Sequence, residues 1–242
     1  MPFAITEDTL FNGLLSCRQH GAGYRFSVDA VLLAHFCRPR PQARILDLGA
    51  GCGVISLILC YRNPRIKVTA LELQPRLAEL IAVNIELNRF QERITLLEGD
   101  LRTTPVFFAP ETFDWVVCNP PYGKLAAGRQ NPDIEQAVCR HEIHAELTDI
   151  VRAISFNLKN RGRAALIYPA SRAALLLSAL KTAGLEPKKL QIVYSYPGGV
   201  GKLVLVEAVK NGGEELIVPP PFFIYEKQGG NYTAEMARLY AP

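Results

Sequence analysis

The chain has 242 residues, of which 49% are hydrophobic and 21% are charged, which suits one α/β domain with a sizeable core. Its longest uninterrupted apolar run, Val54 to Tyr61, is far shorter than the roughly 20 residues of a membrane-spanning helix, and the first ten residues lack the pattern of a secretion signal. We therefore expect a cytoplasmic protein with no membrane partner.

Charge and cysteine content narrow the class of protein further. The net charge of +4 permits nucleic-acid binding without demonstrating it, because a dedicated binder usually carries a denser basic stripe. The six cysteines include no C-x-x-C pair, so we expect reduced thiols, with neither disulfides nor a zinc site.

The first 42 residues predict a β-hairpin followed by a helix. Within residues 9–19 an Asn-Gly pair lies between apolar runs, which is a typical hairpin signal. Residues 26–36 predict a helix with Ser27 at its N-cap and Asp29 in its first turn, where a carboxylate suits the helix dipole.

From residue 43 onward, strand and helix patterns alternate. Strands are expected at 43–49, 67–73, 94–100, 113–119, 163–169, 190–196 and 203–209, and helices at 54–63, 75–88, 144–158 and 171–184. The alternation at short spacing predicts a parallel sheet with right-handed crossovers, and the glycine-rich link between the last two strands predicts an antiparallel hairpin. The apolar, aromatic tail at 218–240 is expected to pack back on the domain.

A glycine-rich turn, DLGAGCGV, separates the first of these strands from the helix behind it. Such a turn lets a ligand approach the backbone beside the positive end of a helix, whereas packing alone would not justify the chain entropy lost at three glycines. A dinucleotide fingerprint would need glycine where Val54 stands, so the turn instead suits a cofactor without a pyrophosphate, notably S-adenosylmethionine. The expected contacts are Asp47, Gly49, Ala50, Gly51 and Gly53.

Acidic residues end the next two strands. Glu72, followed by Leu73, stands 25 residues after Asp47, where an acid typically accepts from ribose hydroxyls. Asp100 ends the third strand, where its carboxylate can accept from an adenine amine while Leu101 covers the ring. Each acid alone could equally cap a strand, but three of them at successive strand ends beside a glycine turn favour a cofactor site.

The fourth strand runs into the sequence CNPPYG, residues 118–123. Because proline restricts the residue before it and lacks an N–H group, Asn119 and Pro120 should be rigid, and the Pro120 carbonyl should be left free to accept. The Asn119 side-chain oxygen would be a second acceptor beside it. This pair would bind both hydrogens of a planar amine and stabilise the positive charge that develops as the amine attacks a methyl sulfonium. Tyr122 would stack on a flat substrate group. A rigid strand-end turn is the alternative interpretation.

The glycine turn followed by N-P-P-Y resembles class I S-adenosylmethionine-dependent methyltransferases that modify amino groups. The stretches 23–36, 139–142 and 224–240 are further similar to the bacterial tRNA1(Val) adenine-N6 methyltransferase family, with its methyltransferase small domain. The resemblance covers nearly the whole chain and implies methyl transfer from S-adenosylmethionine to the N6 of the tRNA adenine next to the anticodon. It also implies an α/β, Rossmann-like fold with a seven-stranded, mostly parallel sheet, one antiparallel strand and helices on both faces.

The same resemblance implies roles for individual residues and a domain division. Residues 43–242 would form the methyltransferase domain, and residues 1–42 would be an N-terminal extension. Gly49, Gly51, Glu72 and Asp100 would bind the cofactor, while Asn119, Pro120 and Tyr122 would hold the target base. Weaker candidates for substrate contact are Asp29, Pro121, Arg140, His141 and Glu142.

Aromatic and histidine side chains outside these motifs have plainer interpretations. Tyr24 and Phe26 could flank a flipped base, although packing in the core is the preferred interpretation for both. His141 and His144 have no third ligand in sequence reach, so we expect no metal there.

The acceptor pair of Asn119 and Pro120, called the amine clamp below, would also suit substrates other than tRNA. A protein glutamine-N5 methyltransferase of the release-factor type would use the same clamp, but such enzymes carry an N-terminal helical domain of roughly 70 or more residues. Here 42 residues precede the first core strand. Ribosomal RNA is a further alternative, and DNA ranks behind it because no added recognition domain is evident. A cofactor-binding RNA chaperone would need a damaged clamp, and Asn119 is intact.

Overall fold

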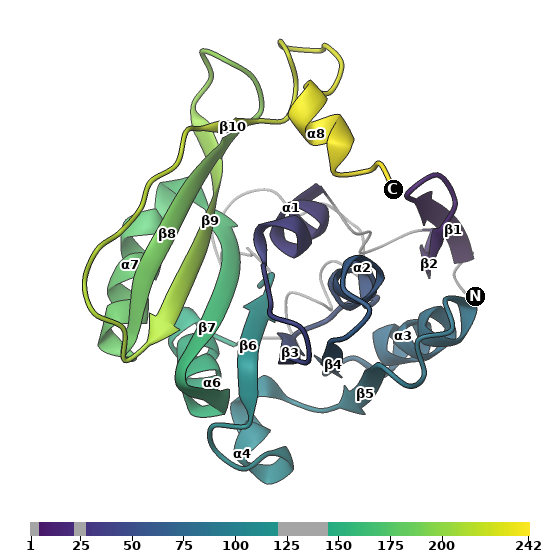
Figure 1. Ribbon diagram of the computed structural model, residues 1–242, viewed down its shortest axis with the longest axis vertical. Coiled ribbons are helices and arrows are strands. Elements are labelled where there is room, and N and C mark those ends of the chain that lie inside the picture. The colour runs from purple at the N-terminus through teal and green to yellow at the C-terminus, as the bar shows by residue number, and fades with distance from the viewer. Residues whose placement is uncertain (1–4, 22–27, 121–144) are drawn as a thin grey trace, which may run out of the picture.

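The computed structural model describes residues 5–21, 28–120 and 145–242. Its centre is an eight-stranded sheet with the order β10-β8-β9-β7-β6-β3-β4-β5 (Figure 1). The strands are β3 (Arg44–Leu48), β4 (Lys67–Glu72), β5 (Ile94–Glu98), β6 (Phe113–Cys118), β7 (Leu158–Pro169), β8 (Leu185–Tyr194), β9 (Gly201–Lys210) and β10 (Phe222–Phe223).

Strand direction in this sheet agrees with the prediction. β3 to β7 are parallel, whereas β9 is antiparallel to both of its neighbours, β7 and β8. The predicted mostly parallel sheet with one antiparallel strand is therefore confirmed. The two-residue β10, which adds to the free edge of β8, is an eighth strand that the sequence did not predict.

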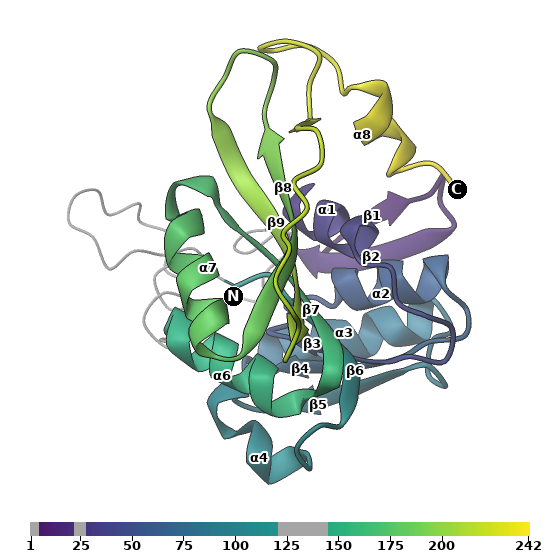
Figure 2. The same cartoon turned by 60° about the vertical axis from the view of Figure 1, so that its left-hand side comes forward.

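Helices cover both faces of the sheet (Figure 2). The helices are α1 (Val28–Phe36), α2 (Val54–Arg62), α3 (Pro75–Leu87), α4 (Thr104–Phe107), α6 (Leu147–Asn157), α7 (Ala173–Thr182) and α8 (Ala234–Arg238), with 3-10 turns at Leu101–Thr103 and Ala170–Arg172. One apolar core lies between the sheet and α1, α2 and α3, and the other lies beneath α6 and α7. None of the described helices is long and apolar enough to cross a membrane.

Alternation along the central strands produces the two cores. On β6, Trp115 and Val117 belong to the core under α2, and Val116 and Cys118 belong to the core under α6. Both sets are buried, as expected for a parallel strand covered on two faces.

The N-terminal hairpin is formed as predicted. β1 (Ile5–Leu10) and β2 (Leu15–His20) pair antiparallel, and the turn contains three residues with positive φ, of 55° at Phe11 and Asn12 and 84° at Gly13. Asp29 lies in the first turn of α1, as expected. The proposed N-cap, Ser27, lies outside the described residues.

The C-terminal tail packs on the domain, which confirms the sequence expectation. Phe222, Ile224 and Met236 are buried in the same core as α1 and α2. Tyr232 stacks against Tyr225 and Tyr240, with ring centroids 5.2 and 5.8 Å away. The tail thereby brings the C-terminal end beside the hairpin β1–β2 (Figures 1 and 2).

Two strands and two short helices differ from the prediction. β7 and β8 begin at Leu158 and Leu185 rather than at 163 and 190, because residues before the predicted apolar runs already pair with a neighbouring strand, Leu158 with Phe113 and Leu185 with Lys210. The sequence also missed α8 in the tail, and α4 with the 3-10 turn before it.

Candidate active site

Strand register brings the predicted site residues to one edge of the sheet. Leu48, near the end of β3, pairs with Leu71 on one side and Cys118 on the other. β4 and β5 are likewise in register where they end. The glycine turn, Glu72, Asp100 and Asn119 therefore all lie at the carboxyl ends of adjacent parallel strands, where ligands bind in open α/β sheets.

The glycine turn adopts a conformation that requires glycine at alternate positions. The φ angles are 71° at Gly49, 61° at Gly51 and 84° at Gly53, all in the left-handed region. The backbone N–H groups of Gly49 and Ala50 donate to the Leu71 carbonyl at 2.9 and 3.0 Å, which holds the turn against β4. A Cβ added at Gly49 would meet nothing within 4 Å, so open space adjoins the turn where a ligand could contact the backbone.

Asp47 is fully buried beneath this turn. Its Oδ2 accepts a hydrogen bond from Ser56 Oγ at 2.7 Å, whereas its Oδ1 has no partner among the described residues. Burial raises the pKa of the carboxyl to about 7, and the hydrogen bonds from Ser56 lower it only in part. An unpaired acceptor buried at the turn fits a site for a group that carries positive charge.

Glu72 links the glycine turn to the end of β4. Its Oε2 accepts from the backbone N–H of Gly51 at 2.8 Å, and its Oε1 accepts from the backbone N–H of Gln74 at 2.9 Å. Burial raises the pKa of the carboxyl, and these donors oppose the shift. Oε1 also accepts from the Gln74 side-chain amide at 3.4 Å, so a further bond from a ribose hydroxyl would go to the second lone pair of Oε2. Leu73 is half-buried next to it.

Asp100 is engaged by an arginine that the sequence reasoning did not include. Arg102 Nε donates to both carboxylate oxygens at 3.0 and 2.8 Å, and the backbone N–H of Arg102 donates to Oδ1 at 2.8 Å. These hydrogen bonds lower the pKa of Asp100. The carboxylate thereby caps the 3-10 turn after β5, where Leu101 packs against the core under α6.

The two residues predicted to bind the amine, Asn119 and Pro120, follow β6 directly. Asn119 is half-buried and Pro120 is buried at the edge shared with the glycine turn. Asp29 is half-buried in α1. The remaining candidates lie outside the described residues: Tyr24, Phe26, Pro121, Tyr122, Arg140, His141, Glu142 and His144.

Ser56 and Asn84 are further polar residues that sequence reasoning missed. Both are fully buried, Ser56 on α2 against Asp47 and Asn84 on α3, where its amide reaches the Cys52 carbonyl of the glycine turn at 2.9 Å. A polar residue at an otherwise apolar helix position was the available signal for each. Within the described residues, no cluster of three or more His, Cys, Asp or Glu side chains could hold a metal ion.

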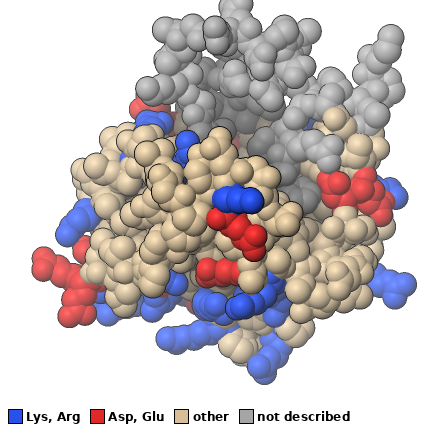
Figure 3. Space-filling model, turned by 90° about the horizontal axis from the view of Figure 1, so that it is seen from above, with Lys and Arg blue, Asp and Glu red and all other residues tan. Residues whose placement is uncertain are grey.

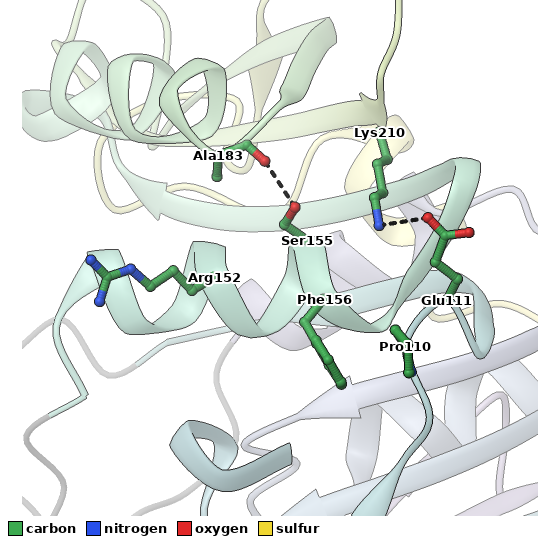
Figure 4. Close-up of a pocket in the computed structure, with 7 residues that line it drawn as sticks. All are labelled: Pro110, Glu111, Arg152, Ser155, Phe156, Ala183 and Lys210. Carbon is green, nitrogen blue, oxygen red and sulfur yellow. Dashed lines mark hydrogen bonds and ion pairs between the residues drawn. The ribbon is translucent and has the colours of Figure 1, made fainter. Parts of the chain in front are cut away.

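A pocket of about 590 Å³ lies at the opposite end of the strands, where the parallel strands begin (Figure 4). Its lining includes Glu111 just before β6 and Lys210 at the end of β9, with Ser155 and Phe156 of α6. Lys210 Nζ lies 3.1 Å from Glu111 Oε1 and donates to the Leu158 carbonyl at 2.9 Å, so its charge is already paired. We do not assign the active site to this pocket, because it lies where the parallel strands begin.

Charged side chains are dispersed on the face seen from above (Figure 3). In this view most lysine and arginine side chains lie toward the lower rim, whereas aspartate and glutamate lie near the centre and at both sides. The surface thus agrees with the modest net charge of +4.

Comparison with known proteins identifies the family. The family model described as methyltransferase small domain matches residues 27–143. A Porphyromonas gingivalis protein named tRNA1(Val) (adenine(37)-N6)-methyltransferase is 30% identical over 233 residues, which cover 93% of this chain and 90% of that protein. The chain belongs to this methyltransferase family. A Shewanella halifaxensis protein of the same name is 30% identical to this methyltransferase over 218 residues, covering 86% and 87% of the two chains.

Solved structures agree with the fold of this methyltransferase. A predicted O-methyltransferase from Agrobacterium tumefaciens superimposes with a TM-score of 0.72 at 25% identity, covering 88% of this chain and 95% of that one. TrmN from Thermus thermophilus superimposes with a TM-score of 0.55 at 26% identity, covering 75% of this chain and 48% of that one. The predicted methyltransferase family and its Rossmann-like fold are confirmed.

Proposed function

We propose that this methyltransferase transfers a methyl group from S-adenosylmethionine to the N6 amine of an adenine in tRNA, in the cytoplasm. The observation that carries the proposal is the position of Asn119 and Pro120, at the same sheet edge as a turn of three positive-φ glycines. The names of the relatives support valine tRNA as the substrate, with adenine 37 as its target.

The residues at this edge fit the proposed cofactor. Within the described part of the chain, Gly49 borders open space and Asp47 Oδ1 has no partner, which suits a ligand that contacts the backbone and carries positive charge. S-adenosylmethionine supplies an electrophilic methyl group on a sulfonium. In the proposed assignment, the cofactor is held by Asp47, Gly49, Ala50, Gly51, Gly53, Glu72, Leu73, Asp100, Leu101 and Asn119.

The clamp acts on the amine of the target base. The Asn119 side-chain oxygen and the Pro120 carbonyl would each accept one N6 hydrogen, which draws the nitrogen toward tetrahedral geometry. As the nitrogen attacked the methyl carbon, the methyl–sulfur bond would break and S-adenosylhomocysteine would leave. The nitrogen would then carry the positive charge, and both acceptors would interact more strongly with it than with the neutral amine. The extra proton then leaves to solvent. Tyr122 would stack on the base, and Asp29, Pro121, Arg140, His141 and Glu142 are further candidates for substrate contact.

Labelled cofactor tests the choice of substrate. The full chain is incubated with tritiated S-adenosylmethionine and, separately, with valine tRNA, the same tRNA carrying guanosine at position 37, ribosomal RNA and a release factor. We expect N6-methyladenosine in the first tRNA and no label in the substituted one. Label confined to the release factor would replace the proposal with glutamine-N5 methylation, and label confined to ribosomal RNA would replace tRNA as the substrate.

The clamp itself is tested by Asn119→Ala. The variant should still bind S-adenosylhomocysteine, because the other nine residues assigned to the cofactor are intact, yet its turnover should fall by about two orders of magnitude or more. Asn160→Ala is the matched control, since Asn160 is exposed near the opposite edge of the sheet. Wild-type turnover in Asn119→Ala would contradict the mechanism.

A further inference from the structure

Two asparagines, Asn84 in the last turn of α3 and Asn88 at its C-cap, bind the N-terminal hairpin. Asn84 Oδ1 accepts from the backbone N–H of Arg18 at 2.7 Å, and Asn84 Nδ2 donates to the Arg18 carbonyl at 2.9 Å. Asn88 forms the same pair with Ser16, at 3.0 Å for the accepted bond and 2.7 Å for the donated one. Each side-chain amide thus pairs with β2 as the backbone of a neighbouring strand would.

Asn84 differs from Asn88 in two contacts, one of which reaches the glycine turn. Its Nδ2 donates to the Cys52 carbonyl at 2.9 Å, so both amide hydrogens and the oxygen of this fully buried side chain are used. The same Nδ2 lies 3.7 Å from Cys17 Sγ of β2. The second bond donated by Asn88 Nδ2 instead goes to the Asn84 carbonyl at 2.8 Å. Of the two asparagines, both pair with the hairpin, and Asn84 joins it to the turn.

The Cys52 peptide needs such support because of its neighbours. It lies between Gly51 and Gly53, which have positive φ and the widest conformational freedom of any residue. Glu72 fixes the turn from one side through the N–H of Gly51, and Asn84 fixes it from the other through the Cys52 carbonyl. The Cys52 thiol adds a contact to the hairpin, with its Sγ 3.8 Å from Cys17 Sγ.

We propose that Asn84 is a positioning residue for the cofactor, which holds the glycine turn in its binding conformation by anchoring it to the hairpin. The inference rests on the proposed function in one respect, that the turn binds S-adenosylmethionine. It assigns the hairpin a role at the active site even though the hairpin lies outside the central sheet. Loss of Asn84 should therefore weaken cofactor binding, whereas turnover at saturating cofactor should change little.

Asn84→Ala and Asn88→Ala form a matched pair for the test. Each removes one amide pair with β2, and only Asn84→Ala frees the Cys52 carbonyl. The dissociation constant of S-adenosylhomocysteine is measured by calorimetry, at a temperature below the unfolding transitions of both variants. It should rise about tenfold in Asn84→Ala, as expected for one unpaired buried carbonyl, and less than threefold in Asn88→Ala. At saturating cofactor, turnover of both variants should stay within about threefold of wild type. Equal affinities in the two variants would overturn the inference.

Hydrogen exchange of the ligand-free protein provides a readout that needs no cofactor. Residues 49–54 contain the turn, whose Gly51 and Gly53 amides are hydrogen-bonded in the native protein. Exchange in this segment should accelerate in Asn84→Ala and stay at the wild-type rate in Asn88→Ala. Unchanged exchange in both variants would refute a role for Asn84 in holding the turn. Failure of the wild type to bind S-adenosylhomocysteine would instead refute the proposed function.

The isosteric variant Asn84→Asp extends the test if Asn84→Ala does not fold. It keeps the side-chain volume and the acceptor for Arg18 N–H but, when ionised, loses both donors. The same tenfold loss of affinity and the same faster exchange at residues 49–54 are expected, and wild-type values for both would overturn the inference.

Discussion

Two carboxyl groups of the candidate active site have pKa values shifted in opposite directions. Asp47 is buried, one of its oxygens has no partner among the described residues, and its pKa is raised from 3.8 to about 7. Asp100 is partly exposed and bonded to Arg102, and its pKa is lowered. In the ligand-free protein near neutral pH, therefore, Asp100 is ionised whereas Asp47 is divided between its two protonation states. A positively charged ligand beside Asp47 would favour its ionised form.

The raised pKa of Asp47 predicts a stability that falls with pH. Because the native state holds the proton more tightly than the unfolded state, the free energy of unfolding should decrease as pH rises from about 4 to about 7, by roughly 3 kcal/mol from this group. Asp47→Asn removes this dependence. Urea unfolding of the ligand-free proteins at pH 4.5 and pH 8 should show the wild type losing stability relative to Asp47→Asn.

Asp100→Asn is a control for which the stability difference from wild type should change with pH in the opposite direction. The lowered pKa of Asp100 means that its ionised form stabilises the native state, and this contribution is lost as pH falls below 3.8. The wild type should therefore lose its advantage over Asp100→Asn in acid and keep it at neutral pH. A stability difference between wild type and Asp47→Asn that does not vary with pH would contradict the ionisation assigned to Asp47.

At the scale of elements, prediction from sequence worked best where each strand is buried on both faces. β3, β4 and β6 and the helices α2 and α3 begin and end within two residues of their predicted bounds, because apolar runs and glycine or proline mark them. The places of the candidate site residues that lie on or just after these strands, such as Asp47 and Asn119, could be predicted for the same reason. Their arrangement at one edge follows from parallel strand order alone.

Elements that form through contacts between residues far apart in the sequence could not be predicted. β10 is two residues long and exists because Phe222 pairs with Val193 on β8. The hydrogen bond from Asn84 to Cys52 likewise joins residues far apart in the chain, so no local pattern signals it. The helix α4 falls in this group, since it packs against the end of β5 through Phe107.

The contact between β5 and α4 can be tested at Gly99. A Cβ there would lie 2.6 Å from Phe107 Cζ, so Gly99→Ala must displace the ring. Phe107 is 38% exposed and can move outward, so we expect a loss of about 1 kcal/mol in stability rather than a failure to fold. In Gly99→Ala/Phe107→Ala the clash is absent, and a double-mutant cycle by urea unfolding should give a coupling energy of about 1 kcal/mol. Strict additivity would show that α4 does not pack there.

On the scale of the whole molecule, the two ends of the chain share one core. Leu10 and Phe11 of the hairpin, Trp115 of the central strand β6 and Met236 of α8 all belong to the apolar cluster around α1 and α2. A cluster that joins segments from residue 10 to residue 236 should unfold in one cooperative step rather than by release of the tail alone.

Met236 tests this cooperativity, because it lies in the tail and is fully buried. Met236→Ala should lower the stability of the whole protein by about 3 kcal/mol, the usual cost of a cavity in a packed core. The single tryptophan, Trp115, reports on the central sheet, so its fluorescence and the far-UV circular dichroism should shift together to lower urea. Val218→Ala, in the same tail but 57% exposed, should change stability by less than about 0.5 kcal/mol. If Met236→Ala left the Trp115 transition at its wild-type midpoint, the tail would be a separate unit, and the hairpin, sheet and tail could not be treated as one core.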